Sequence, residues 1–368
     1  MTLFATCPSR RALSLVPLLA AALFSAVVAH GSPGPKPPGG PADAAAPSPQ
    51  LTPVTTYADG RARAGYVDPD GKIVLPLVYE FATYFAEGLA SVAVTPDRWG
   101  YIDRTGRLAI APTFEFAGAF HDGRACVALS PAEGAGGARA PERNAVIDAT
   151  GKVVFETGAS AIEDFHDGLA YVTGRGFVDR DGKTVVAREF EEHLPFSDGR
   201  AAVRIGERWG VIDAKGALVI PATLAYVKPF SSGYAPVLAE PYGKWTFVDK
   251  AGKPAFQPFF QAEPFQEGLA AVEAVEGSFG FIDTTGALVI PAKFRKVTGF
   301  SEGLAAAWPR GDEQGGFIDR TGAFVFRLDF FESFGFREGV ARITSGMKLE
   351  GYVNRKGVTI WPPKPTER

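Results

Sequence analysis

The chain has 368 residues, of which 46% are hydrophobic and 21% charged, and a formal net charge of −3. A chain of this size and composition can bury a large core. The slightly negative charge supplies no basic field for a nucleic-acid backbone, so DNA and RNA are excluded as expected partners.

The first 29 residues have the pattern of a secretory signal peptide. Arg10 and Arg11 precede an apolar run over 12–28, and small residues that suit signal peptidase follow it. A membrane anchor is the alternative, but a run of 17 residues lies at the lower limit for a spanning helix. Cys7 comes before the apolar run, which is the wrong place for a lipid-attachment cysteine. We therefore expect an exported protein, periplasmic or secreted, with no transmembrane segment once the signal is removed.

A linker rich in Pro, Gly and Ala is expected over 30–53. Eight prolines and almost no large apolar side chain lie in this stretch, so it cannot bury enough surface to offset chain entropy. It could tether the folded part to an envelope partner or serve only as a spacer. The folded domain is expected over 54–363, with a short tail at 364–368.

Cys126 would be the only thiol of the exported chain, so no intramolecular disulfide is expected. A reactive thiol is one possibility, but no His or Asn spacing supports it. A small buried apolar role is favoured.

A turn of the form Asp-x-x-Gly recurs along the rest of the chain, flanked by short β-type runs. Its first residue is Asp68, Asp103, Asp148, Asp179, Asp213, Asp249, Asp283 or Asp319, and finally Asn354. The acid can bond its own backbone and the glycine accepts a positive φ, so each copy predicts a hairpin. Successive copies lie 31 to 45 residues apart, the signature of an array of one supersecondary unit.

A second element, Phe-x-acid-Gly followed by an apolar run, keeps the same period. Phe85-Ala86-Glu87-Gly88 and Phe265-Gln266-Glu267-Gly268 are examples. Together the two elements predict nine three-stranded antiparallel meanders in an all-β fold. The middle strand is apolar at both parities, as at Tyr101 and Ile102, so both faces of each sheet must be covered by neighbouring units.

The array could be an open superhelical stack or a closed, propeller-like ring. One position of the first strand is small or apolar inside the array but is Arg63 and Arg342 in the two end units. Only an open stack needs polar outer faces at its ends, so we favour the open form.

These residues resemble the bacterial WG repeat, also called the KWG repeat. Trp99-Gly100-Tyr101-Ile102-Asp103 and Trp209-Gly210-Val211-Ile212-Asp213 carry its defining doublet, and the resemblance covers about residues 57 to 362. Some units depart from the doublet, such as Trp245-Thr246 and Phe279-Gly280. The resemblance implies tandem β-structure, frequent export, no common activity and no catalytic residues.

Three periodic features could carry chemistry, and each has a structural explanation. Asp68-Pro69-Asp70-Gly71 and Asp179-Arg180-Asp181-Gly182 each resemble half of a calcium loop, but the other seven copies of the turn have no second Asp. His121 and His166 share a slot that other units fill with Ala, Ser, Gln or Arg, whereas metal sites demand fixed ligands. The acids of Phe-x-acid-Gly could supply a glycosidase pair, but a catalytic pair should be unique, and these acids recur as backbone-capping turn residues. No catalytic, metal or cofactor-binding residue is therefore assigned.

The leading hypothesis is an exported, non-enzymatic repeat scaffold that binds a protein or an envelope glycan. The alternatives are a secreted, carboxylate-dependent glycan hydrolase and a purely structural envelope spacer. Binding should reside in residues outside the repeat. Trp308, beside Pro309-Arg310-Gly311, is predicted to be an exposed contact residue, because aromatic residues are enriched where partners dock. The further candidates are the doublets Phe259, Phe260, Phe330 and Phe331.

Overall fold

The fold was analysed in a computed structural model, which describes residues 49–58, 60–129, 143–311, 314–330, 332–345 and 348–361. All regular structure within these ranges is β-strand, and adjacent strands pair antiparallel. The predicted all-β class is confirmed. No helix of the described residues has the length and apolar character needed to cross a membrane. The predicted signal peptide and most of the predicted linker lie outside the described residues.

The chain divides into two compact units, which are described separately. One contains 45–68 and 72–189, and the other contains 190–368 together with the short turn 69–71. We call them the N-terminal and C-terminal units. The choice between an open stack and a closed ring stays a prediction, as does the number of nine repeats.

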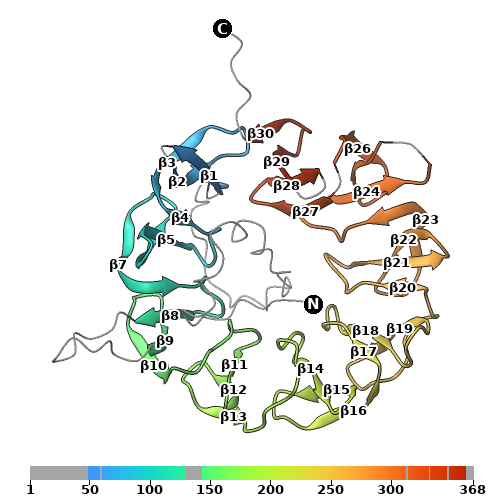
Figure 1. The fold of residues 1–368 in the computed structure, drawn as a ribbon. Helices are drawn as coiled ribbons and strands as arrows, with labels where there is room; N and C mark the ends of the chain where they lie inside the picture. The colour runs from blue at the N-terminus through green and yellow to red at the C-terminus, as the bar shows by residue number, and fades with distance from the viewer. Residues whose placement is uncertain are drawn as a thin grey trace, which may run out of the picture. The chain divides into compact units, whose positions relative to one another are not determined.

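The N-terminal unit consists of a succession of antiparallel sheets (Figure 1). The first sheet holds β1 (Thr52–Ala58), β2 (Arg61–Val67) and β3 (Ile73–Tyr79). A seven-stranded sheet follows, with β4 (Phe81–Ala82), β5 (Leu89–Thr95), β6 (Arg98–Asp103), β7 (Leu108–Ala117), β8 (Ala125–Leu129), β9 (Arg143–Ile147) and β10 (Val153–Gly158). The last holds β11 (Leu169–Val172), β12 (Gly176–Asp179) and β13 (Thr184–Val186). The predicted domain start at 54 lies within β1.

The C-terminal unit repeats the same plan in four sheets (Figure 1). Two three-stranded sheets hold β14 (Arg200–Ile205), β15 (Arg208–Asp213) and β16 (Leu218–Leu224), then β17 (Tyr226–Val227), β18 (Tyr234–Leu238) and β19 (Trp245–Asp249). The seven-stranded sheet holds β20 (Gln261–Ala262), β21 (Leu269–Val275), β22 (Ser278–Asp283), β23 (Leu288–Val297), β24 (Ala305–Pro309), β25 (Gly316–Ile318) and β26 (Phe324–Arg327). The last sheet holds β27 (Glu332–Arg337), β28 (Val340–Ser345), β29 (Lys348–Asn354) and β30 (Thr359–Trp361).

Several meanders carry a short extra strand that the sequence did not reveal. β4, β17 and β20 are two-residue strands that pair with the first strand of their own meander. β7 serves both as the third strand of one meander and as the extra strand of the next. Ile110 pairs with Tyr101 of the first meander, and Phe116 pairs with Ala128 of the second. This shared strand is why two meanders join into one seven-stranded sheet.

The Asp-x-x-Gly turns form as the sequence predicts. In the copy at Asp213, Oδ1 accepts hydrogen bonds from the backbone N–H of Lys215 and of Ala217, both at 2.9 Å. These bonds favour the charged carboxylate and lower the pKa of Asp213. The turn glycine also packs on the preceding repeat: Gly151 has φ +85°, and a Cβ there would lie 2.8 Å from Cγ2 of Ile110. This turn thus closes a hairpin and contacts the preceding repeat, as do the turns at Gly106, Gly182, Gly252, Gly286, Gly322 and Gly357.

The glycine of the Trp-Gly doublet lies beneath the third strand of its own meander. A Cβ on Gly100 would lie 2.6 Å from the carbonyl oxygen of Ile110, and one on Gly210 would lie 2.9 Å from that of Ile220. Only glycine allows this close approach of two backbones. The middle strand is covered on both faces, as predicted, because Tyr101 and Ile102 are both 0% exposed.

Candidate functional site

The acids of Phe-x-acid-Gly join successive repeats. Glu87 Oε2 accepts a hydrogen bond from the backbone N–H of Gly123 in the next repeat at 2.9 Å, and Asp198 Oδ2 accepts one from Gly233 at 2.6 Å. The same bond runs from Gly168 to Asp122, from Gly303 to Glu267 and from Gly339 to Glu302. The sequence analysis expected these acids to cap a turn, and the structure adds that the capped N–H belongs to the following repeat. These five carboxylates hold the array together.

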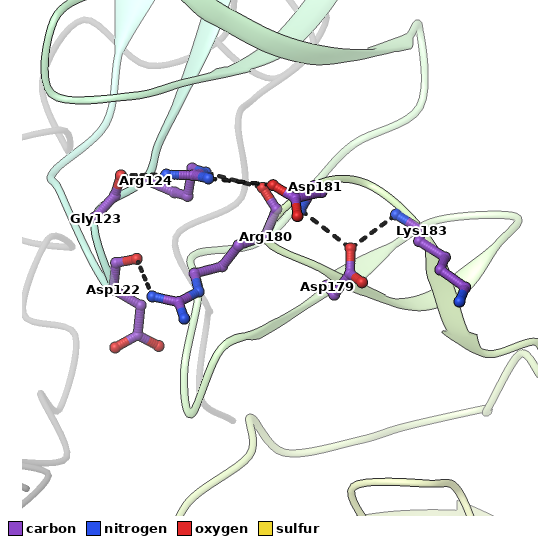
Figure 2. Close-up of polar contacts among 7 residues, drawn as sticks. All are labelled: Asp122, Gly123, Arg124, Asp179, Arg180, Asp181 and Lys183. Carbon is purple, nitrogen blue, oxygen red and sulfur yellow. Dashed lines mark hydrogen bonds and ion pairs between the residues drawn. The ribbon is translucent and has the colours of Figure 1, made fainter.

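We call this contact between the Phe-x-acid-Gly turns of successive repeats a joint. Arginines also take part in it, as Figure 2 shows for two neighbouring repeats. Arg180 Nη1 donates to the carbonyl oxygen of Asp122 at 3.4 Å, and Arg124 Nε donates to that of Arg180 at 2.8 Å. Arg124 also pairs with Asp181, with 3.4 Å between Nη2 and Oδ1. Asp179 Oδ1 accepts from the backbone N–H of Asp181 at 3.0 Å. Asp179 and Asp181, one of the two aspartate pairs considered for calcium, therefore take part in the turn and the joint. No group of three metal-ligating side chains occurs among the described residues.

The two histidines of the Phe-x-acid-Gly slot meet at this joint. The rings of His121 and His166 stack with centroids 5.6 Å apart, and His121 Nε2 lies 3.7 Å from Oδ2 of Asp164. Burial raises the pKa of Asp164 to about 6, while His121 opposes the shift. Burial raises the pKa of Glu163 to about 8, with Asp164 adding to it, and lowers that of His166. Sequence reasoning missed Asp164, although no other repeat places an acid directly before the Phe.

Most of the predicted contact residues are buried, so the expectation of exposure is wrong for them. Trp308 is only 4% exposed: its Nε1 donates to the carbonyl oxygen of Phe330 at 3.1 Å, and the two rings meet edge to face at 5.0 Å. Phe330 is 5% exposed and Phe259, which packs against Phe247, is 2% exposed. Phe331 lies outside the described residues. The neighbouring repeat supplies the cover, which the local sequence cannot show.

Phe260 is the predicted contact residue that does reach the surface. It is 37% exposed, and the Lys244 ammonium lies 4.3 Å from its ring centroid. The backbones of Trp245 and Phe259 exchange two hydrogen bonds of 2.8 Å, so the Phe259 side chain lies on the same face as Trp245 and the side chain of Phe260 on the other. Three other aromatic rings of this unit form a group.

Trp209, Tyr226 and Trp245 form this group, which we call the aromatic row. The ring centroids of Trp209 and Tyr226 lie 5.7 Å apart, and those of Tyr226 and Trp245 lie 5.9 Å apart. Tyr226, on the short strand β17, is 40% exposed. The sequence analysis did not identify Tyr226, because a two-residue strand has no periodicity to mark it.

The N-terminal unit has a similar row. The Trp99 ring lies between Phe81 and Phe116, at 5.4 Å from each. In both units the repeat tryptophans therefore contact the aromatic residues of the short strands.

A family model described as the WG containing repeat matches residues 65–94, 99–129, 176–209, 209–239, 245–274 and 279–307. Together these ranges span half of the chain. The chain belongs to this family. In the WG repeats of this protein the glycine admits the third strand, and the tryptophan packs against aromatic residues of the short strands.

No curated protein matches this WG-repeat chain at a significant level. Among solved structures it is similar to BamB from Moraxella catarrhalis, with 13% identity over 81% of this chain and 98% of that one and a TM-score of 0.37. It is also similar to the dihydro-heme d1 dehydrogenase NirN, with 14% identity, coverage of 85% and 76%, and a TM-score of 0.38. Virginiamycin B lyase from Staphylococcus aureus gives 11% identity, coverage of 73% and 92%, and a TM-score of 0.33. These scores support no conclusion about activity.

Proposed function

We propose that the protein is an exported, non-enzymatic WG-repeat scaffold that binds a protein or an envelope glycan through the aromatic row. The carrying observation is Tyr226, which is 40% exposed between the rings of Trp209 and Trp245. Partly exposed aromatic rings stack on sugar rings and anchor protein partners. Phe260 and Tyr226 would make the contacts, and the tryptophans would hold Tyr226 in place.

The use of the repeated acids supports the non-enzymatic part of the proposal. Five of them accept a hydrogen bond from the next repeat, so their carboxylates serve the array. A contact that recurs from repeat to repeat is what a structural role produces, whereas a catalytic pair should be unique. Substrate chemistry would have to come from residues outside the repeat.

Export is supported by the sequence of the first 29 residues. Arg10 and Arg11 before the apolar run 12–28 form the pattern of a secretory signal. The test is to fuse residues 1–29 to a reporter enzyme and follow it by cell fractionation. Export predicts reporter in the periplasm or medium, and reporter retained in the cytoplasm would contradict it.

Binding is tested with the full chain and material from the bacterial envelope. Tyr226→Ala and Phe260→Ala should reduce the recovery of envelope polysaccharide or protein at least tenfold, while the unfolding midpoint stays within about 2 °C of the parent. Tyr242→Ala is the matched control, because Tyr242 is a fully exposed tyrosine of the same unit that makes no contact with the row. Equal recovery by all three variants would refute the role of the row, and no recovery by the parent would favour an envelope spacer.

A further inference from the structure

The surroundings of Trp99 in the N-terminal unit and of Trp245 in the C-terminal unit share one strand arrangement. Phe81 of β4 and Trp99 of β6 pair with the same residue of β5, and Tyr226 of β17 and Trp245 of β19 pair with the same residue of β18. In both, the ring of the short strand contacts the tryptophan, with centroids 5.4 Å apart at Phe81 and 5.9 Å apart at Tyr226. The two tryptophan sites can therefore be compared position by position.

At Trp245 the chain places a cation of its own against the tryptophan. Lys228 follows Tyr226 by two residues, and its ammonium lies 4.6 Å from the Trp245 ring centroid. The same Nζ lies 2.7 Å from Oε1 of Glu263. An ammonium group is attracted to the face of an aromatic ring, and most strongly to that of tryptophan. This position of the repeat therefore suits a positive charge.

In the N-terminal unit the two corresponding positions hold no charge. Thr83 stands in the place of Lys228, two residues after the aromatic residue of the short strand. Gly118 stands in the place of Glu263, two residues before the Phe of the next repeat. The Thr83 hydroxyl lies 3.0 Å from that of Ser91 and accepts a hydrogen bond from the Ser91 backbone N–H at 3.1 Å. The short threonine side chain is thus held against β5, and both members of the ion pair are missing.

Three aromatic rings meet at this site without a cation of the chain. Phe81 is 38% exposed, whereas Trp99 and Phe116 are partly buried, and the Phe116 ring lies 5.4 Å from that of Trp99. None of the cation–ring contacts among the described residues involves any of the three rings. The segment 79–118, which supplies them, carries five acids and three arginines. Its charge therefore favours a cationic ligand over an anionic one.

The polar groups at the site favour a quaternary ammonium over a primary one. Trp99 Nε1 donates to the carbonyl oxygen of Pro96 at 3.2 Å, so the indole N–H is already used. A primary ammonium has three N–H donors that need acceptors, and Gly118 cannot supply the carboxylate that Glu263 offers to Lys228. A quaternary ammonium has no N–H group, and groups of aromatic rings are its usual binding sites.

We propose that Phe81, Trp99 and Phe116 bind a quaternary ammonium group, such as that of choline. The ammonium takes the place at Trp99 that Lys228 Nζ takes at Trp245. This site goes beyond the proposed function, because it adds a cationic ligand in the N-terminal unit and uses no residue of the aromatic row.

The test is an NMR titration of the full chain that follows the indole N–H signals of its five tryptophans. Choline chloride should shift the Trp99 signal saturably at millimolar concentration, with sodium chloride of equal ionic strength as the blank. The uncharged isostere 3,3-dimethylbutan-1-ol should bind at least tenfold more weakly. Phe81→Leu, which keeps apolar volume but removes a ring, should weaken choline binding about fivefold. Tyr226→Leu is the matched control in the C-terminal unit and should leave the Trp99 titration unchanged.

Exchanging the residues at the lysine position gives a sharper test. Thr83→Lys should supply the site with an ammonium of the chain and reduce its affinity for choline about tenfold. Lys228→Thr should free Trp245, so that choline shifts the Trp245 signal as well. Urea unfolding checks that each variant keeps the cooperative transition of the parent.

Three results would each overturn the inference. These are no saturable shift at Trp99, equal or tighter binding of dimethylbutanol, and choline affinity that Phe81→Leu leaves unchanged. If Thr83→Lys fails to fold, Phe81→Leu and Lys228→Thr still decide, because Phe81 is largely at the surface and Lys228 lies in the other unit. Failure here is separable from failure of the proposed function, because recovery of envelope material that depends on Tyr226 does not involve the rings at Trp99.

Discussion

Two sets of joints between repeats use the same slot of Phe-x-acid-Gly with different chemistry. In the C-terminal unit Ser197 and Ser231 each donate from Oγ to the carbonyl oxygen of the next Phe, both at 2.6 Å. In the N-terminal unit the slot holds His121 and His166, whose rings stack beside Asp164. The array forms with either set.

The difference shows which part of the joint the fold requires. The bond from acid to glycine N–H is present in both units, as at Asp122 and Asp198. The residue before the acid varies between repeats, so the joint does not depend on its identity. The histidine joint also contains Asp164, whose pKa burial raises to about 6, whereas a serine hydroxyl does not titrate in this range. Four substitutions test which contacts within and around the joints stabilise the array.

The largest effect is expected from the turn glycine that contacts the neighbouring repeat. Gly151→Val would place a branched side chain at φ +85°, with its Cβ 2.8 Å from Ile110. Backbone strain and overpacking together should lower the free energy of unfolding by about 4 kcal/mol. Chemical denaturation measures this fall in the free energy of unfolding. Gly123→Val is the control: it has φ +73° but nothing within 4 Å of a Cβ, so it should cost only about 1–2 kcal/mol.

Loss of one joint acid should have the next largest effect. Asp198→Ala removes the acceptor of the Gly233 N–H and places alanine at φ 55°, so the free energy of unfolding should fall by about 3 kcal/mol. Asp198→Asn keeps an acceptor and tolerates this backbone conformation, so it should cost less than half as much. Equal losses for the two variants, measured by urea unfolding, would show that the hydrogen bond is not what matters.

His193 lies outside the joints and should contribute a pH dependence of its own. Burial lowers its pKa to about 4, below the usual 6.5, so its contribution is fully present above pH 6.5 and is lost as the pH falls towards 4. The free energy of unfolding should fall by about 2 kcal/mol over this window. His193→Gln should remove this part of the pH profile, since glutamine does not titrate. A variant profile parallel to that of the parent would contradict the assignment.

The smallest effect is expected when one joint is converted into the other. His121→Ser gives the N-terminal unit the residue that Ser197 and Ser231 provide in the C-terminal unit. Because the Asp122 link to Gly168 is retained, the free energy of unfolding at pH 7.5 should change by less than about 1 kcal/mol. A loss of several kcal/mol, seen by thermal or urea unfolding, would mean that the histidine stack is required.

The sequence predicted what repeats and missed what depends on contact between repeats. The turn at Asp213 and the coverage of both faces of the middle strand follow from local chemistry and period. Asp164 meets His121 only through the packing of two repeats, so no local pattern marks it. Trp308 was expected at the surface for the same reason: the cover that Phe330 gives it comes from a segment 22 residues away.

The short strands escaped prediction for a different reason. Two residues, as in β17, are too few to show a β-type alternation. In the segment around Trp308 the exposed residues are Arg310 and Gly311, whereas Trp308 and Pro309 are buried.

The central claim is that the repeated acids hold the array together through glycine N–H groups of the next repeat. Amide hydrogen exchange, followed residue by residue by NMR, tests it directly. The amides of Gly123, Gly168, Gly233, Gly303 and Gly339 should be protected. Glu302→Ala should accelerate exchange at Gly339 at least tenfold while Gly233 keeps its rate. Fast exchange at all five glycines in the parent, or no change at Gly339 in the variant, would contradict the account.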